Sequence, residues 1–430
     1  MIFFSMQEIF DILFDSGSSF SHLLKNSSVN NQTPDLYCEG VDQFSGWFQS
    51  SLLLSVAVDE KAPYKSLLVH GFVVDEENKK MSKSIGNVIE PKQAVKGDTK
   101  LKLPQCGLDV LRFWVAHDYS KPQIPIGANI LSKFLKRVFE IRSIIRFLAS
   151  NLNDLHTTTT TTATATKPIE EVLINDFHSL CPLDKYLLVN LKTLKSQVIE
   201  SYTDMNVTRA LLLLESFLLN ELSSFYVKSV RDRLYCDGKM SWERRRAQTA
   251  IYHALTNLVC LLAPILPHLA EEAFQYSILR RQCDNKMQSE GEEGEENNKK
   301  KSSISLFRSD YGLFESERTQ HLLKQIDPIV ESNVRDLFKM IFFVRERFFS
   351  TIKSNNPAIY EIDLILKDEK QIKLIEMMII NKQQKQQQQK NNKNEWPIEC
   401  IGCSNVNIIK KFEQHQLNVN DDDENSDDME

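Results

Sequence analysis

The chain has 430 residues and a formal net charge of −6, from 52 basic and 58 acidic side chains. This length allows two to four domains at ~100–200 residues each. No stretch approaches the ~18 continuous apolar residues of a membrane-spanning helix, so no membrane contact is expected. The last ten residues, DDDENSDDME, hold seven of the acids, and the remainder is close to neutral. A nucleic-acid partner is therefore not excluded, because local basic patches govern such binding.

The cysteines and the first residues indicate a reducing compartment and no leader peptide. Six of the eight cysteines stand singly, without the spacing of a disulfide framework. The first residues include Glu8, Asp11 and Asp15 but no Lys or Arg before Lys25. Because signal and transit peptides carry early positive charge, we expect neither in this sequence.

Three low-complexity stretches divide the chain: TTTTTTATAT (157–166), DNKMQSEGEEGEENNKKKS (284–302) and NKQQKQQQQKNNKN (381–394). None holds enough apolar side chains to fold alone, so we expect loops or insertions. The expected regions are an α/β domain at 1–127, a helical domain at 128–280 that contains the insertion 157–166, a polar linker at 281–305, a small α/β region at 306–380 and a low-complexity, acidic tail at 381–430.

The first half of the chain predicts a mixed α/β structure. SLLVHGFVV (66–74) is an apolar run rich in Val and Leu, followed by the polar turn DEEN, which is typical of a buried strand. The lysine-rich segment KKMSKSIGN (79–87) then forms a loop. Pro91 favours the start of a helix at PKQAVK (91–96), and GLDVLRFWVAH (107–117) predicts a second helix.

From residue 128 the apolar spacing becomes helical. Steps of four and three place one set of side chains on a single helix face: Ile130, Phe134, Val138, Ile141, Ile145 and Leu148. Further helices are predicted at about 183–201, 204–236, 241–265 and 267–280, with Pro264 and Pro267 between the last two. The pattern predicts an α-helical bundle over 128–280. Farther on, a helix at 327–353, a strand at 358–366 and a helix at 369–380 predict a small α/β unit.

The lysine loop has two possible interpretations. Lys79, Lys80 and Lys83 lie within five residues, beside small and polar side chains. Three ammonium groups on a flexible loop can reach a polyphosphate as mobile point charges, where nucleotidyl chemistry needs positive charge at developing oxyanions. The other reading is a solvated basic turn, and spacing alone favours it.

Longer segments around the loop carry a more specific signal. In chain order they are DILFDSGSS (11–19), DLYCEGVDQFSGWFQSSLL (35–53), APYKSLLVHGFVVDEENKKMSKSIGNVIEP (62–91), GLDVLRFWVAHDY (107–119), LDKYLLVNLK (183–192), SFYVKSVRDRLY (224–235) and AQTAIYHALTNLVCLLAPILPHLAEEAF (247–274). KMSKS (80–84) is similar to the second signature of class I aminoacyl-tRNA synthetases. The ordered set resembles isoleucyl-tRNA synthetases of the bacterial and organellar branch over about residues 9–380, apart from the insertions.

The resemblance implies an ATP-dependent ligase that forms isoleucyl-adenylate and transfers isoleucine to the 3′ end of tRNA-Ile. Its substrates would be ATP, with Mg²⁺, isoleucine and tRNA. The residues implied for ATP binding are Lys80, Met81, Ser82, Lys83 and Ser84. Those implied for aminoacyl-adenylate binding are Glu39, Gly40, Asp42 and Gln43, where the two carboxylates suit an α-ammonium group or ribose hydroxyls. Trp47 is expected in the core or the pocket wall. The branch implies the mitochondrial matrix, with the cytoplasm as the alternative.

This sequence departs from the family pattern in several places. The family's first signature, His-Ile-Gly-His, and its editing insertion do not occur in the 430 residues, so we expect a fragment without the first half of the nucleotide-binding sheet. Phe44-Ser45 stands where the family usually has His-Arg, and Leu13 where it usually has Trp. The C-terminal zinc module is reduced to Cys400 and Cys403, at most half of a four-ligand site, so zinc is not expected.

Basic side chains in the helical region are candidates for tRNA phosphate contacts: Lys228, Arg231, Arg233, Arg244 and Arg245. A spacing of three puts Lys228 and Arg231 on one helix face. The alternative is a solvated face whose bases pair with nearby acids such as Glu243 and Asp232.

The fold class predicted is α/β plus all-α: a partial Rossmann-like class I catalytic domain, a helical anticodon-binding bundle and a small C-terminal α/β module. The implied function is isoleucine–tRNA ligase, with this chain as a fragment not expected to be active alone. Two alternatives remain open: a non-catalytic tRNA-binding protein, and one piece of a split synthetase whose missing half a separate chain supplies.

Overall fold

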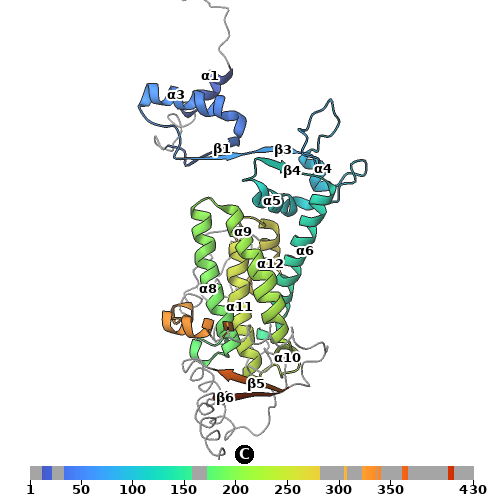
Figure 1. Ribbon diagram of the computed structural model, residues 1–430, viewed down its shortest axis with the longest axis vertical. Helices are drawn as coiled ribbons and strands as arrows, with labels where there is room; N and C mark the ends of the chain where they lie inside the picture. Colours follow the sequence, from blue (N-terminus) through green and yellow to red (C-terminus); the bar gives the residue numbers. More distant parts are fainter. Residues whose placement is uncertain are drawn as a thin grey trace, which may run out of the picture. The chain divides into compact units, whose positions relative to one another are not determined.

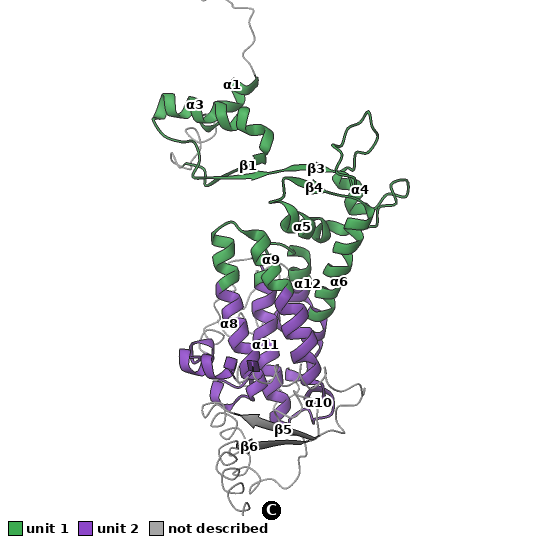
Figure 2. Cartoon of the chain, viewed as in Figure 1, with its two compact units in different colours: residues 1–144, 197–215, 261–272 green, residues 145–196, 216–260, 273–430 purple. Residues whose placement is uncertain are grey.

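The computed structural model describes residues 12–21, 33–156, 172–280, 305–307, 322–336, 338–339, 361–366 and 405–410. The chain divides into two compact units, coloured separately in Figure 2. Unit 1 comprises Met1–Ile144, Gln197–Glu215 and Leu261–Glu272; unit 2 comprises Ile145–Ser196, Ser216–Cys260 and Ala273–Glu430. The described part is rich in helices and has few strands, as Figure 1 shows.

Unit 1 contains short parallel strand pairs covered by helices. Its elements up to residue 125 are α1 (Ile12–Gly17), β1 (Leu36–Gly40), the 3-10 helix η1 (Val41–Ser45), α3 (Trp47–Asp59), β2 (Ser66–His70), β3 (Phe72–Val74), α4 (Pro91–Lys96), α5 (Gly107–Asp118) and β4 (Gln123–Pro125). β1 pairs with β2, from Leu36 opposite Ser66 to Gly40 opposite His70. β3 pairs with β4, from Phe72 opposite Gln123 to Val74 opposite Pro125.

The single buried strand predicted at 66–74 is wrong in two respects, because it splits into β2 and β3 at Gly71 and only Gly71 and Val74 of the segment are buried. The two short strands pair with different partners. A Cβ at Gly71 would lie 2.2 Å from the carbonyl oxygen of Pro122, which is backbone. Only glycine therefore fits where the chain passes from one strand pair to the other.

The helices around the lysine loop begin where the sequence predicts. Pro91 is the first residue of α4, and Glu90 with Gln93 forms a capping box. α4 ends at Gly97, whose φ of 81° is accessible to glycine. α5 is anchored within unit 1 by Arg112, whose guanidinium donates to the carbonyl oxygens of Pro264 (2.7 Å) and Ile265 (3.1 Å).

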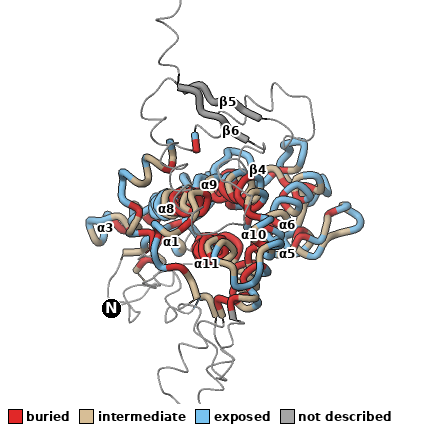
Figure 3. The backbone as a smooth tube through the Cα atoms, turned by 90° about the horizontal axis from the view of Figure 1, so that it is seen from below, coloured by how far each residue is buried: buried red, intermediate tan, exposed pale blue. Residues whose placement is uncertain are grey.

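The remaining helices follow the predicted order. They are α6 (Ala128–Ser150), the 3-10 turns η2 (Asn153–His156) and η3 (Phe177–Ser179), α8 (Pro182–Thr203), α9 (Val207–Ser216), the π-helix η4 (Phe217–Val227), α10 (Arg231–Tyr235), α11 (Trp242–Leu262) and α12 (Pro267–Gln275). On α6, five residues of the predicted face are buried: Phe134, Val138, Ile141, Ile145 and Leu148. α11 is buried along most of its length (Figure 3). Their assembly into one antiparallel bundle stays a prediction.

The continuous helix predicted at 204–236 is also wrong, because the structure has three segments there. α9 widens into a π-helix at Phe217, where the Ser224 hydroxyl donates to the carbonyl oxygen of Leu219 at 2.7 Å, five residues earlier. The chain then leaves helical geometry at Val230 (φ −100°, ψ 1°) before α10. Helical periodicity alone does not reveal such a widened turn.

The segment Val207–Val227 is the one helix in the described part that is long and apolar enough to span a membrane. Over half of its most apolar window, 56%, is buried inside the protein. Burial of this kind is typical of a core helix, which passes the same test of length and composition.

At the C-terminus, the described backbone includes two strands, β5 (Glu361–Leu366) and β6 (Asn405–Lys410), which pair in parallel. β5 confirms most of the strand predicted at 358–366. β6 lies in the region expected to be a low-complexity tail, and its sequence NVNIIK is rich in β-branched residues. The helix expected at 369–380, most of that expected at 327–353, and the insertion at 157–166 lie outside the described residues.

Replacing Gly71 with alanine tests the strand switch. Because the added methyl meets backbone atoms of Lys121 and Pro122, we expect G71A to lower the free energy of unfolding of unit 1 by about 1–3 kcal/mol. Gly238→Ala is the matched control, since nothing lies within 4 Å of its Cβ position. Chemical denaturation should show G238A close to the parent; equal stability of G71A and the parent would contradict this packing.

Candidate functional site

The lysine loop leaves the carboxyl end of β3 and runs to α4. Lys80 makes an isolated antiparallel bridge to Val74, and the rest of the segment is turn and coil. Lys80, Lys83 and Ser84 are exposed, and Met81 and Ser82 are half-buried. The loop is therefore neither helical nor buried, which confirms its predicted position after the strand.

Asp75 and Asn87 clamp the two ends of this loop. One carboxylate oxygen of Asp75 accepts the backbone N–H groups of Glu77 (3.1 Å) and Lys79 (2.8 Å). The other accepts the Asn87 side-chain amide at 2.8 Å, and the Asn87 oxygen in turn accepts the backbone N–H of Ser82 at 2.9 Å. These bonds close the base of the loop while its lysines stay in solvent.

The clamp lowers the pKa of the Asp75 carboxyl, chiefly through the Asn87 hydrogen bond and then through the Lys79 backbone N–H. Its stabilising contribution is therefore complete above the carboxyl's unfolded pKa and is lost as pH falls through the lowered folded value. At neutral pH the base of the loop is closed by an ionised carboxylate.

The tip of the loop is a compact turn. The Ser82 hydroxyl accepts the backbone N–H of Ile85 at 3.3 Å and lies 3.1 Å from the Ser84 hydroxyl. Gly86 has a φ of 77°, and its N–H donates to the Ser82 carbonyl at 3.1 Å. The Met81 sulfur faces inward and accepts the N–H of Ile89 at 3.4 Å. The methionine thus anchors the turn, while Lys80 and Lys83 are exposed.

The two lysines differ in what they touch. The Lys80 ammonium lies 5.3 Å from the centroid of the Phe72 ring, a cation–π geometry. Lys83 makes no ion pair within the described part of the chain. Both charges are accessible to an anionic ligand without breaking an ion pair.

Glu76 ties the loop to α6, a contact that sequence reasoning missed. Its carboxylate accepts the backbone N–H groups of Asn129 (2.8 Å) and Ile130 (3.3 Å) and the Asn129 side-chain amide (2.9 Å). These are unpaired donors of the first turn of α6, where negative charge is favoured. A Cβ at Gly127 would lie 2.2 Å from the Glu76 side chain. A capping residue contributed by a distant segment leaves no local sequence signal.

The residues expected to bind the adenylate lie at the carboxyl end of β1. Glu39 and Asp42 are exposed, Gly40 is buried and Gln43 is half-buried. The Gln43 amide donates to Asp42 at 2.9 Å and its oxygen accepts the Trp47 N–H at 3.1 Å. Two carboxylates therefore face solvent at the end of a parallel strand, where ligands bind in such sheets.

His70 is a second residue at this edge that the sequence did not single out. It ends β2, directly opposite Gly40 in the register. Its Nδ1 lies 2.9 Å from the carbonyl oxygen of Gly71. The half-buried ring thus stands next to the segment that carries Glu39 and Asp42.

Trp47 is half-buried, and its place in a pocket wall stays a prediction. Its ring stacks on Tyr37 with centroids 4.3 Å apart and an interplanar angle of 8°. The indole N–H donates to the carbonyl oxygen of Ser16 at 2.9 Å, which fixes α1 to α3. Phe44 and Leu13, the departures from the family pattern, are both exposed, at 57% and 43%.

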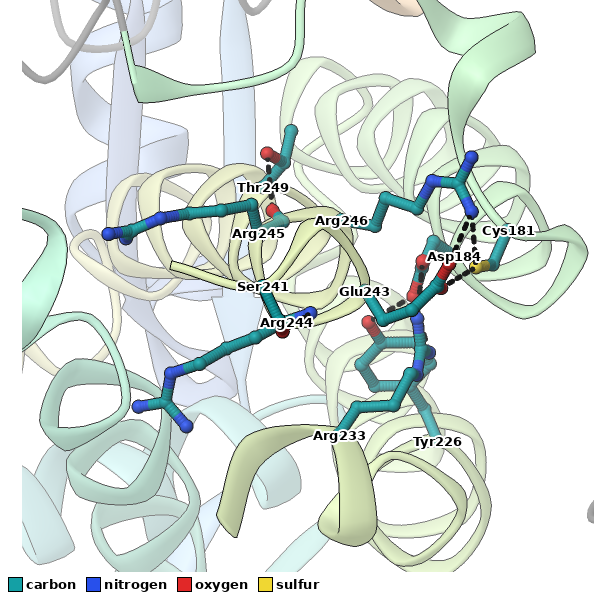
Figure 4. Close-up of polar contacts among 10 residues, drawn as sticks. All are labelled: Cys181, Asp184, Tyr226, Arg233, Ser241, Glu243, Arg244, Arg245, Arg246 and Thr249. Carbon is teal, nitrogen blue, oxygen red and sulfur yellow. Dashed lines mark hydrogen bonds and ion pairs between the residues drawn. The ribbon is translucent and has the colours of Figure 1, made fainter. Parts of the chain in front are cut away.

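The basic side chains of the helical region fall into two groups. Lys228 and Arg231 are exposed, but the break at Val230 separates them, so they do not share one regular helix face as predicted. Arg233 is turned inward: it makes two 2.9 Å bonds to the buried Asp184, which also accepts the Tyr226 hydroxyl at 2.7 Å (Figure 4). Burial alone would lower the pKa of Arg233, but the Asp184 charge outweighs it and raises that pKa well above its usual value.

The three arginines that open α11 also have partners inside unit 2, and Figure 4 shows them pointing in different directions. Arg244 binds Asp154 at 2.8 Å, and Arg245 is buried and donates to Gln248 at 2.8 Å. Arg246 donates to Glu243 at 2.9 Å. The hypothesis of tRNA phosphate contacts is therefore kept for Lys228 and Arg231, while Arg233, Arg244 and Arg245 hold the unit together.

Metal-binding geometry is absent from the described residues, where no group of three or more His, Cys, Asp or Glu side chains could hold an ion. Cys400 and Cys403 lie outside them. The expectation about zinc is thus untested.

Comparison with known proteins assigns two regions of the chain to families. The family described as class I tRNA synthetases (I, L, M and V) matches residues 3–125, and the anticodon-binding domain of tRNA ligases matches residues 184–341. The chain thus contains class I tRNA synthetase and anticodon-binding domain regions. The lysine loop lies in the first matched region, and the exposed Lys228 and Arg231 lie in the second.

Known relatives of this synthetase chain are isoleucine–tRNA ligases. The mitochondrial enzyme of Macaca fascicularis is 35% identical over 86% of this chain and 33% of its own length. The mitochondrial enzyme of Gallus gallus is 41% identical over 63% of this chain and 26% of its own length. The Gloeobacter violaceus enzyme is 39% identical over 63% of this chain and 26% of its own length. The chain thus spans about a third or less of the relatives it matches. A solved structure of an Agrobacterium radiobacter LeuRS complex covers 61% of the chain with a TM-score of 0.44 and 18% identity.

Glu76→Gln tests whether this carboxylate fixes the base of the synthetase's lysine loop. The amide keeps the size of the side chain but loses the negative charge that the α6 N–H groups favour. We expect faster trypsin cleavage after Lys79, Lys80 and Lys83, together with a loss of about 0.5–2 kcal/mol in the free energy of unfolding. Glu77→Gln is the matched control, because Glu77 is exposed and makes no such cap. Equal cleavage rates for the two variants would refute the anchor.

A double-mutant cycle tests the internal role of Arg233. Removing one member of a buried ion pair strands the other, so R233M should cost about 3–5 kcal/mol of unfolding free energy. R233M combined with D184N should cost less than the sum of the two single changes. Additive losses, measured by urea denaturation, would show that the two side chains do not act as a pair.

Proposed function

We propose that this chain supplies the ATP-phosphate loop and the anticodon-binding part of an isoleucine–tRNA ligase. The observation that carries the proposal is the exposed KMSKS loop, clamped at its base by Asp75 and Asn87, in a chain whose relatives are isoleucine–tRNA ligases. Residues 1–127 are proposed as the second part of a Rossmann-like catalytic domain, and residues 128–280 as the helical anticodon-binding bundle.

In the proposed reaction, the carboxylate of isoleucine attacks the α-phosphate of ATP and pyrophosphate leaves. Lys83 and Lys80 are proposed to stabilise negative charge on the leaving phosphates, since both reach solvent from a loop whose base is fixed. Charge delivered by a loop acts most usefully when it binds the transition state better than the ground state. Met81, Ser82 and Ser84 shape the turn that presents these ammonium groups.

The proposed adenylate site is the end of β1. Glu39 and Asp42 present carboxylates that can accept bonds from the α-ammonium group or from ribose hydroxyls. Gly40 is buried opposite His70, and a Cβ there would approach Asp42 at 2.6 Å. Gln43 holds Asp42 in place through its amide. Mg²⁺ that accompanies nucleotides is commonly held by phosphates and one or two carboxylates, so no residue is assigned to it.

The printed sequence contains no His-Ile-Gly-His signature, so the 430 residues are proposed to act with the region that carries it, whether on the same polypeptide or on a separate chain. The alternative of a tRNA-binding protein without catalysis shares the same anticodon-binding domain. The mitochondrial relatives support a location in the mitochondrial matrix.

Binding of tRNA and pyrophosphate exchange together test the proposal. The 430-residue chain should bind a tRNA-Ile transcript at least roughly tenfold more tightly than the same tRNA with a changed anticodon, because single-stranded bases are read by direct contacts. It should show no isoleucine-dependent exchange alone, since ATP positioning supplies several kcal/mol of barrier reduction. Binding without preference for the tRNA-Ile anticodon would contradict the anticodon role. Exchange at a normal enzymatic rate would contradict the need for the histidine signature.

A further inference from the structure

The segment that follows the lysine loop continues its positive charge. Between residues 79 and 102 the sequence holds seven lysines but only two acids, Glu90 and Asp98. All seven lysines are exposed, and none forms an ion pair with another described residue. Four of them lie outside the KMSKS turn: Lys92, Lys96, Lys100 and Lys102. We call these four the α4 lysine strip.

The two acids of the segment are used for its own structure. The Glu90 side chain accepts a backbone N–H in the capping box of α4. Asp98 accepts the N–H groups of Lys100 (2.8 Å) and Leu101 (3.0 Å) and the Gln93 amide (2.9 Å). Neither carboxylate forms a salt bridge with an ammonium group of the strip among the described residues, although the Lys100 charge, after the Leu101 backbone N–H and other hydrogen bonds, contributes to the lowered pKa of Asp98.

The strip stands on a defined scaffold. Lys92 and Lys96 are four residues apart on α4 and so share a face, although like charges at this spacing cost the helix about 0.2–0.5 kcal/mol. α4 ends at Gly97, and residues 98–103 then form a tight hairpin in which Asp98 and Leu103 exchange backbone hydrogen bonds of 3.1 and 2.8 Å.

The hairpin is unusual in its backbone. Lys102 has a φ of 53°, a left-handed conformation that is uncommon for a residue other than glycine. Leu103 is buried, which fixes the base of the turn. Lys100 and Lys102 are thus exposed at the tip of the hairpin, which directly follows the helix that carries Lys92 and Lys96. In Figure 1 this hairpin and the KMSKS loop are the two loops drawn beside α4.

We propose that the α4 lysine strip binds the phosphodiester backbone of tRNA. Ammonium groups act as point charges and suit a repeating anion, whereas recognition of a single phosphate usually employs arginine forks or converging backbone N–H groups. A membrane surface is disfavoured, because no large apolar side chain of residues 91–103 is exposed to insert into lipid beside the strip; the exposed Ile85 and Leu108 lie outside this segment. The inference rests on the proposed function for the identity of the RNA.

The strip would contribute affinity without reading sequence. Backbone contacts position a nucleic acid and carry no base information. They release counterions, so each contact steepens the dependence of binding on salt. The strip is therefore a separate device from the anticodon-binding domain, and the two have different experimental signatures.

The test compares tRNA binding by the full 430-residue chain and by K92Q/K96Q and K100Q/K102Q variants over a series of salt concentrations. Each double variant should reduce the slope of log Kd against log salt by about 1–2, or roughly one per lysine. It should weaken binding by the same factor for tRNA-Ile and for the changed-anticodon tRNA. Thermal unfolding should be unchanged, because these side chains are exposed.

K133Q/K136Q is the matched control, since it removes two exposed lysines of α6 in unit 1 that form no salt bridge with another described residue. The proposal that the strip binds tRNA would be overturned if the slope of log Kd against log salt were unchanged in both strip variants. A reduction no larger than that in the control would overturn it as well. The proposal would also be overturned if these lysines were needed for binding to anionic lipid vesicles but not for binding to tRNA. If tRNA binding depended on these lysines but showed no preference for the tRNA-Ile anticodon, the role of the strip would be supported and the proposed function would be contradicted.

Discussion

Two adjacent carboxylates determine where the lysine loop can be. Asp75 and Glu76 open the turn that follows β3, in which the N–H of Asn78 donates to the carbonyl oxygen of Asp75 at 3.0 Å. Asp75 turns back into the loop and closes its base through Asn87, whereas Glu76 turns outward and caps α6. The loop is consequently held at its base and bare at its tip. Without both contacts, three lysines within five residues would repel one another on an unanchored segment.

The segment around α4 and the arginines that pack inside unit 2 employ their positive charges in opposite ways. Around α4 the cations are lysines, and the nearby acids bind backbone groups instead of ammonium groups. In unit 2, by contrast, Arg233 and Arg244 have the internal partners Asp184 and Asp154. A planar guanidinium can satisfy a buried carboxylate with two bonds, whereas an ammonium is strongly hydrated and stays in water. Overall charge near neutrality therefore conceals a local positive surface.

The sequence predicted elements whose signals are local. Pro91 with Glu90 and Gln93 marks the start of α4, and the apolar spacing of α6 identifies its buried face. The split at Gly71 was not predicted, because an apolar run looks the same whether it pairs with one neighbour or two. The π-helix at Phe217 was missed for a similar reason, since one wider turn hardly changes the periodicity.

The candidate site shows the same division between local and distant information. The loop and the end of β1 were found from their own residues. The contacts that hold them were not, because Glu76 meets α6 more than 50 residues away and His70 meets Gly40 only through strand pairing. Arginines gave the opposite error, because the sequence shows a cluster of cations but not the internal partner of each one: Asp184 for Arg233, Asp154 for Arg244 and Gln248 for Arg245.

The resting position of Lys80 bears on how the loop would act in the proposed reaction. Its ammonium lies over the exposed Phe72 ring, an interaction worth about 0.5–1 kcal/mol at such a site. Moving the Lys80 ammonium group from the ring to a phosphate oxygen therefore costs little free energy, whereas breaking a pair with a buried carboxylate would cost several kcal/mol. Among the described residues, Lys83 has neither an ion pair nor a cation–π contact that it would have to break. The rate depends on how much more tightly the protein binds the transition state than the ground state. Because Lys80 gives up only a weak contact with Phe72, most of its attraction to the phosphates remains to stabilise the transition state in which pyrophosphate departs.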